Sequence, residues 1–136
     1  MTTMKSRLLT IFAIVFTASY PASVYAEKQA VKHMDLPDVT SYEEAVRVFN
    51  ETTMELRKKS KLDEAELQEI HIITYSLEKA IAYFSVHMKD EQQDHAKKMA
   101  ELVELVHIGS ENNRAAETEA YLQEYFQLAD PYSDVL

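Results

Sequence analysis

From residue 41 to residue 130 the sequence contains a single glycine, Gly109, and no proline. Sheets need frequent turns, and turns recruit Gly, Pro and Asn. The same region is rich in Glu, Lys, Ala, Leu, Gln and Met, which are strong helix formers. The sequence therefore predicts an all-α fold.

Two helices with regular apolar faces are predicted over residues 41–60 and 63–89. Ser41 with Glu44 matches a capping box, and Asp63 with Glu66 gives a second capping signal. The inward face of the first helix has the spacing of one helix face: Tyr42, Ala45, Phe49, Thr52 and Leu56. The second helix keeps this spacing without a slip: Leu67, Ile70, Thr74, Leu77, Ile81, Phe84 and Met88.

A third helix is predicted over residues 92–108, because the apolar register fails after Met88. Residues 89–95 are wholly polar, which favours a hairpin near residues 89–92, where Asp90 with Gln93 could cap the new helix. The next apolar residues follow a new phase: Ala96, Met99, Leu102, Val103 and Val106. One continuous helix over residues 63–108, which would have to dimerise, stays open as an alternative.

A fourth helix is predicted over residues 113–129. Gly109 is expected at the C-terminal cap of the third helix, and Asp130-Pro131 is expected to close the fourth. The expected inward face of this last helix is less regular than the others and includes polar residues. It consists of Ala116, Glu119, Ala120, Leu122, Gln123, Phe126 and Ala129. The expected architecture of residues 41–130 is an antiparallel up-down-up-down four-helix bundle, with a short tail at residues 131–136.

The first 26 residues have the pattern of a signal peptide. Lys5 and Arg7 precede an apolar run from Leu8 to Ala18, which is too short to span a bilayer. Cleavage is predicted after Ala26, and an uncleaved N-terminal anchor is the alternative. Export would place the protein in the periplasm, as a 110-residue chain (136 − 26 = 110) with residues 27–40 as an extended leader.

The charge and composition of the chain limit the classes of function and partner that we expect. Removal of the signal peptide leaves 12 basic and 23 acidic residues, a formal charge of −11. Nucleic acid and anionic membrane surfaces are therefore poor partners, and no membrane insertion is expected after cleavage. The chain has no cysteine, so disulfides do not stabilise it. No glycine-rich loop or Ser/His/Asp pattern is present, and we do not expect an enzyme.

Two histidines are predicted to lie together in one half of the bundle. Hairpin geometry brings His71 level with His107, close to Tyr75, Glu78 and Glu111. Buried imidazoles with carboxylates are how helical bundles build metal or haem sites. The alternative is a structural layer in which each histidine hydrogen-bonds a neighbour and joins two helices.

A second candidate metal cluster combines imidazole and thioether groups, which suit copper. Its members surround the predicted hairpin: His87, Met88, His95 and Met99, with His33 and Met34 in the leader. Met88 and Met99 already have packing roles in the predicted core. His87 and His95 are expected to face water.

Several short motifs resemble those of an uncharacterised family of small secreted bacterial proteins, known as a domain of unknown function. They are Ile70-His71, Thr74-Tyr75-x-Leu77-Glu78-x-Ala80, Val106-His107-x-x-Ser110-Glu111, and Val31-Lys32-His33 ahead of Ser41-x-Glu43-Glu44-Ala45. This resemblance implies a periplasmic helical protein and brings no known activity.

The predicted architecture is also similar to that of periplasmic cytochrome b562. That resemblance implies haem ligation by a methionine on the first helix, where Met54 stands, and by a histidine on the last. Residues 113–129 contain no histidine. Haem ligation would therefore require His71 or His107.

The sequence thus favours a soluble periplasmic helical-bundle module with a binding or structural role and no catalysis, whose partner is an unknown protein or small ligand. One alternative is a protein that binds copper, zinc or haem through His71 and His107. Another is an envelope stress or chaperone-like accessory, for which a homodimer is open.

Overall fold

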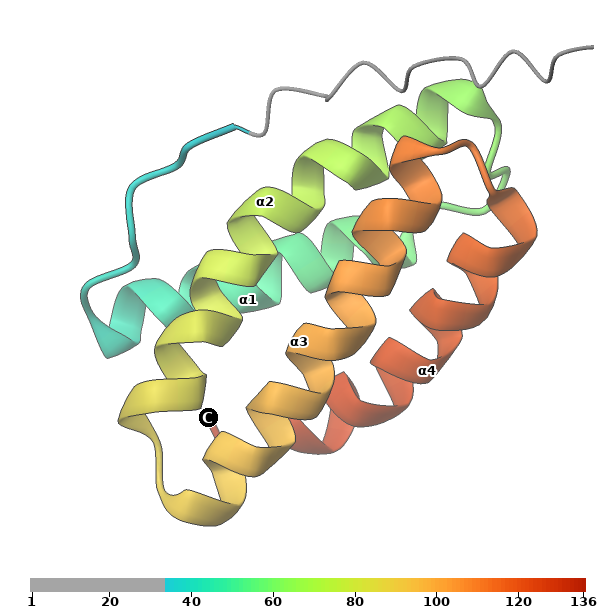
Figure 1. Ribbon diagram of the computed structural model, residues 1–136. Coiled ribbons are helices and arrows are strands. Elements are labelled where there is room, and N and C mark those ends of the chain that lie inside the picture. Colours follow the sequence, from blue (N-terminus) through green and yellow to red (C-terminus); the bar gives the residue numbers. More distant parts are fainter. Residues whose placement is uncertain (1–33) are drawn as a thin grey trace, which may run out of the picture. The chain divides into compact units, whose positions relative to one another are not determined.

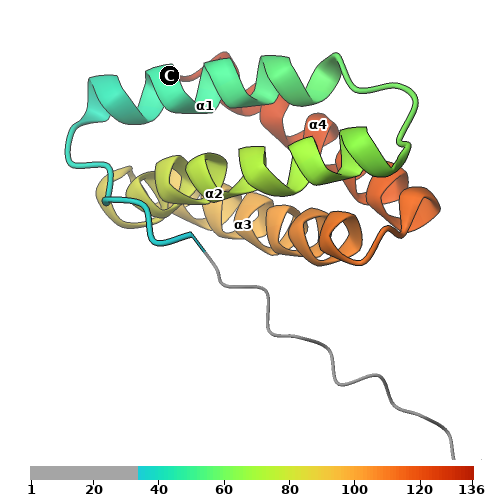
Figure 2. The same cartoon turned by 90° about the horizontal axis from the view of Figure 1, so that it is seen from above.

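The computed structural model describes residues 34–136 and contains four helices in this region. They are α1 (Tyr42–Arg57), α2 (Glu64–His87), α3 (Asp90–Glu111) and α4 (Ala115–Ser133). Consecutive helices pack against each other, and α4 returns to touch α1 through a smaller contact (Figure 1). In Figure 2, α2 lies between α1 and α3. The predicted all-α up-down arrangement is confirmed, whereas the predicted signal peptide lies outside the described residues.

The first two helices begin at the predicted capping residues. The Ser41 hydroxyl accepts the N–H of Glu44 at 3.2 Å, and the Asp63 carboxylate accepts the N–H of Glu66 at 2.9 Å. Their predicted faces are buried, apart from Tyr42 and Met88 at the ends, which are half-buried. For α1 and α2, apolar spacing and caps were sufficient to predict the helices and their buried faces, although α1 ends at Arg57 and not at residue 60 as predicted.

Helices α2 and α3 are separate, so the alternative of one continuous helix is wrong. Met88 and Lys89 both adopt extended backbone between them. Asp90 and Gln93 do not cap α3 as predicted; instead, the Gln93 amide donates to the carbonyls of Val86 and Met88 at the end of α2. Because Gln93 satisfies these α2 carbonyls, the turn is tighter than expected and α3 begins at Asp90.

The end of α3 differs from the prediction. Gly109 does not terminate the helix but lies inside it, and no glycine has a positive φ. The left-handed residue is Asn113, with φ 55°. Its N–H donates to Ser110 at 3.1 Å and the next N–H, of Arg114, donates to Gly109 at 2.9 Å, which is a Schellman ending.

Helix α4 is longer than predicted and turns a different face inward. Pro131 lies within its last turn, and the side chain of the next residue, Tyr132, is buried in the core. The buried face consists of Thr118, Leu122, Tyr125, Ala129 and Tyr132. Of the predicted face only Leu122 and Ala129 are buried; Phe126 is half-buried, and Ala116, Glu119, Ala120 and Gln123 are exposed.

The contact between α1 and α4 closes the bundle with a few specific interactions. The hydroxyls of Thr53 and Tyr125 share a buried hydrogen bond of 2.6 Å. Arg57 pairs with Asp130 and lies over the Phe126 ring, 4.3 Å from its centroid. These contacts lie along the side of α4 that faces α1.

Residues 34–40 form no regular secondary structure, as predicted for the leader. Asp38 pairs with Lys79 on α2 at 2.7 Å, and Val39 packs against the core. Leu36 and Pro37 line a cavity of about 190 Å³ together with residues of α1 and α2. No helix in residues 34–136 is long and apolar enough to cross a membrane.

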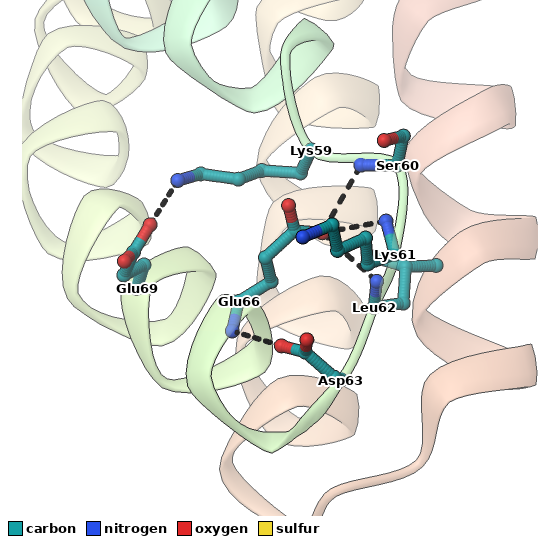
Figure 3. Close-up of polar contacts among 7 residues, drawn as sticks. All are labelled: Lys59, Ser60, Lys61, Leu62, Asp63, Glu66 and Glu69. Atoms are coloured by element: carbon teal, nitrogen blue, oxygen red, sulfur yellow. Dashed lines mark hydrogen bonds and ion pairs between the residues drawn. The ribbon is translucent and has the colours of Figure 1, made fainter.

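The loop between α1 and α2 is organised by the carboxylate of Glu66. Its Oε2 accepts three successive backbone N–H groups, from Ser60, Lys61 and Leu62, at 3.0, 2.7 and 2.9 Å (Figure 3). Leu62 has a φ of 49°, in the left-handed region. The N–H of Leu62 is the largest influence that holds the pKa of the Glu66 carboxyl below its ordinary value, and those of Lys61 and Ser60 act in the same direction.

Replacing Glu66 with alanine should lower the melting temperature, because the three N–H groups lose their common acceptor. Glu66→Gln should lower it less, since the amide oxygen still accepts. The pKa of Glu66 is depressed by folding, so the advantage of Glu over Gln should vanish as the pH falls below the ordinary carboxyl range. Thermal denaturation at pH 7 and pH 3 measures this, with Glu64→Ala in the same turn as control. Equal melting temperatures for Glu66→Ala and Glu64→Ala would contradict it.

Candidate functional site

The polar layer, which we define as His71, Thr74, Tyr75 and Glu78 of α2 with His107 of α3, lies at the α2–α3 interface. His71 and His107 are 3% and 2% exposed, and their ring centroids lie 4.4 Å apart. Tyr75 meets both rings edge-on, at 5.1 and 4.9 Å. The predicted proximity of the two histidines is therefore confirmed.

Thr74 fixes the tautomer of His107. The Thr74 hydroxyl lies 2.7 Å from the His71 carbonyl, which can only accept, so the hydroxyl proton points there. Thr74 Oγ1 also lies 2.8 Å from Nδ1 of His107. With its only proton already used, Oγ1 accepts from His107, which therefore carries a proton on Nδ1. This bond joins α3 to the backbone and side chain of α2.

His71 is held within its own helix. Its Nε2 lies 3.1 Å from the Tyr75 hydroxyl, one turn further along α2. Its Nδ1 is buried and has no hydrogen-bond partner within residues 34–136. A buried ring nitrogen without a partner costs the least free energy when it carries only its lone pair in a neutral ring. An N–H without an acceptor, or a charged ring, would cost more.

Glu78 brings a carboxylate to the edge of this layer. Its Oε1 lies 3.5 Å from Nδ1 of His107, an ion-pair distance if the imidazole is protonated. The side chain is 33% exposed, yet Oε1 itself is buried. Burial, as the largest cause, and the Glu104 carboxylate on α3 together raise the pKa of Glu78 to about 7, against the opposing effect of Lys79. A carboxyl with this pKa exchanges a proton near neutral pH.

The remaining predicted site residue, Glu111, ends α3 one turn beyond His107. It is half-buried, and no hydrogen bond or ion pair in the described region joins it to either histidine. Within residues 34–136 no three His, Asp, Glu or Cys side chains converge on one point as a metal site requires.

The second predicted cluster is dispersed. His87 is exposed and stacks on Tyr83 at 4.3 Å, whereas Met99 is fully buried in the core. His95 was expected to face water, but it is half-buried and its Nε2 donates to the Leu128 carbonyl at 2.8 Å. The half-buried Met88 packs on the core, Met34 is 45% exposed, and His33 lies outside the described residues. His95 thus contacts α4, whereas His87 contacts Tyr83 on its own helix, α2.

Thr74 is the residue of the layer whose role the sequence did not reveal. It stands in the inward stripe of α2, where its spacing suggests only packing. A threonine in a buried stripe, one helical turn from a histidine, is the signal that could have identified it, because its hydroxyl must find a partner there.

Comparison with known proteins gives a family without a known activity. A family described as one of unknown function, DUF6746, matches residues 3–134. The chain belongs to this family. No curated protein and no solved structure matches it.

The DUF6746 chain does not share the haem ligands of cytochrome b562. Met54 stands on α1 as that resemblance requires, but its side chain is 56% exposed and faces away from the bundle interior. α4 contains no histidine. For this DUF6746 protein the polar layer is the part of the fold that needs a functional account.

Proposed function

We propose that this protein is an exported, non-catalytic helical module of the periplasm, and that the polar layer holds α2 to α3 so that the bundle can present its surface to a partner. The observation that carries the proposal is the Thr74 bridge. One hydroxyl joins the His107 ring to the His71 carbonyl, so the layer acts as a buried hydrogen-bonded clasp.

The surroundings of the rings support this structural role. Both histidines are almost fully buried, and Nδ1 of His107 is protonated and committed to Thr74. A metal site needs several ligands directed at one ion, and no three His, Asp, Glu or Cys side chains of residues 34–136 are grouped in this way. The acidic surface favours solubility and basic partners.

Loss of either buried histidine should destabilise the protein without affecting any ligand. We expect His71→Ala and His107→Ala each to lower the free energy of unfolding by about 1–3 kcal/mol, because each leaves a buried partner unsatisfied. His87→Ala, which removes an exposed histidine of α2, is the matched control and should change little. Urea unfolding followed by circular dichroism measures all three, on protein purified from the periplasm after expression of the full chain.

The same preparations distinguish the metal or haem alternative. Titration with Zn(II), Cu(I) and haemin should show no stoichiometric binding to the wild type. Tight one-to-one binding that His71→Ala abolishes, with little change in stability, would overturn the proposed function and assign the histidines to a ligand.

A further inference from the structure

Glu78 is the one residue of the polar layer that reaches from the buried interface to solvent. Its Oε1 is buried and has no hydrogen-bond partner within residues 34–136, although Nδ1 of His107 lies 3.5 Å away. His107 already donates its Nδ1 proton to Thr74 at 2.8 Å. One oxygen of the Glu78 carboxylate, Oε1, is therefore desolvated beside an imidazole whose shorter hydrogen bond goes to Thr74.

The charges around Glu78 do not neutralise it. Glu104, from α3, lies close enough to disfavour ionisation of Glu78. Among the residues that the structure describes, Lys79 on α2 is the cation that acts on Glu78, but its ammonium is bound by Asp38 of the leader at 2.7 Å and is also influenced by Asp35. The polar layer adds the titratable side chains of His71, His107 and Tyr75. The ionised state thus places two carboxylates, from α2 and α3, across one interface.

We propose that Glu78 makes the α2–α3 contact proton-dependent: uptake of one proton by the Glu78 carboxylate tightens the contact, and release of that proton loosens it. This inference rests on the proposed structural role of the polar layer. It adds that the pH of the compartment regulates how firmly α2 and α3 are held together.

The proton binds to Glu78, where it removes the negative charge beside a buried carboxylate oxygen and the repulsion from Glu104. A proton on the second ring nitrogen of His107 would instead place a charge in a ring that is only 2% exposed, and the burial of that charge would cost free energy.

The direction of the pH dependence follows from the pKa of Glu78, which is raised from 4.5 to about 7. Between these values the folded state binds more protons than the unfolded state, so stability falls as the pH rises. The contribution is complete below pH 4.5 and lost above about pH 7. Glu66 and Asp38 have depressed pKa values and act in the opposite direction, at more acidic pH.

The test compares Glu78→Gln with the wild-type full chain, purified from the periplasm, from pH 5 to pH 8.5. For the wild type, we expect the folding equilibrium constant to rise between about 2-fold and 10-fold per pH unit of acidification between about pH 7 and pH 5, and little above pH 7, since one proton is linked and Glu78 is partly exposed. Glu78→Gln should lose this dependence relative to the wild type and be the more stable protein at pH 8. Glu101→Gln removes an exposed charge from α3 and should keep the wild-type slope.

Carbon-13 spectra of the side-chain carboxyl of Glu78 give a second readout, which a merely structural role would not move. The resonance should titrate near neutral pH in the wild type, and at lower pH in Glu104→Gln. Parallel stability curves for wild type and Glu78→Gln, or titration of Glu78 near pH 4.5, would overturn the inference. Failure of the proposed function would instead show as full stability in His71→Ala and His107→Ala.

Discussion

Replacing Phe49 with alanine should lower the free energy of unfolding by about 3–5 kcal/mol. Phe49 is completely buried on α1 and contacts the rings of Phe84 on α2 and Tyr132 on α4, with centroids 5.7 and 6.0 Å away. Phe84 and Tyr132 in turn lie 5.5 Å apart. One side chain therefore joins three helices, and its loss leaves a cavity that no single helix can close.

The size of this effect matters because small domains are only marginally stable. A domain of about 100 residues has an unfolding free energy of roughly 5–15 kcal/mol, so the substitution should remove much of it. Each kcal/mol corresponds to a shift of about 4–8 °C in the melting temperature. Urea unfolding and thermal melts of wild type and Phe49→Ala measure both quantities.

Phe126→Ala is the matched control for this experiment. It removes a phenylalanine ring of the same size from α4. Phe126 is only half-buried, and its ring contacts the Arg57 guanidinium. We expect a loss well below that of Phe49→Ala. If the two variants lost equal stability, or if Phe49→Ala lost less than about 1 kcal/mol, the three-ring cluster would not be the centre of the core.

Helices α1 and α2 could be predicted from the sequence because their information is local. Ser41 and Asp63 cap their own helices, and the buried faces repeat with the helical period. The break after Met88 was visible for the same reason, since the apolar stripe changes phase there. The proximity of His71 and His107 followed from topology, because an antiparallel hairpin fixes which residues are level.

The buried face of α4 could not be predicted because it depends on partners distant in the sequence. Tyr125 is buried with its hydroxyl on Thr53, 72 positions away. The His95 ring was expected in water, yet its partner is a carbonyl of α4. The sequence around a polar side chain does not show that its partner lies on another helix. A search for helical periodicity that counts only apolar residues therefore does not identify such side chains as buried.

The polar layer could also be predicted only in part from the sequence. Its histidines were recognised as a group, but Thr74 was assigned to packing, and the surroundings of Glu78 arise from Glu104 on another helix. Hydrogen-bond direction and desolvation depend on distances of a few ångströms, which spacing along a helix does not specify.

Gly109 is the position where local sequence was most misleading, and its substitution should have the second-largest effect. A glycine near the end of an apolar stripe usually caps the helix. Here the reason for glycine is space: a Cβ at residue 109 would lie 2.7 Å from Oγ1 of Thr118, which is fully buried on α4. We expect Gly109→Val to lower the free energy of unfolding by about 3 kcal/mol, because α3 and α4 must separate.

Alanine at the same position gives a sharper test, since helix propensity and packing then predict opposite signs. Propensity alone favours Gly109→Ala by about 1 kcal/mol in a helix interior. The Thr118 hydroxyl cannot move aside freely, because it donates to the Arg114 carbonyl at 2.9 Å. Gly109→Ala should therefore destabilise the wild type.

In a Thr118→Ala background the obstructing oxygen is gone, and the other nearest atoms, the N and Cα of residue 118, lie 3.5 and 3.6 Å from the added Cβ. These are ordinary contacts, so Gly109→Ala should now stabilise the protein. The four proteins of this cycle, measured by urea unfolding, report the coupling between the two positions. A stabilising Gly109→Ala in the presence of Thr118 would mean that the α3–α4 contact has room for a methyl group, and that Gly109 is there for another reason than close packing.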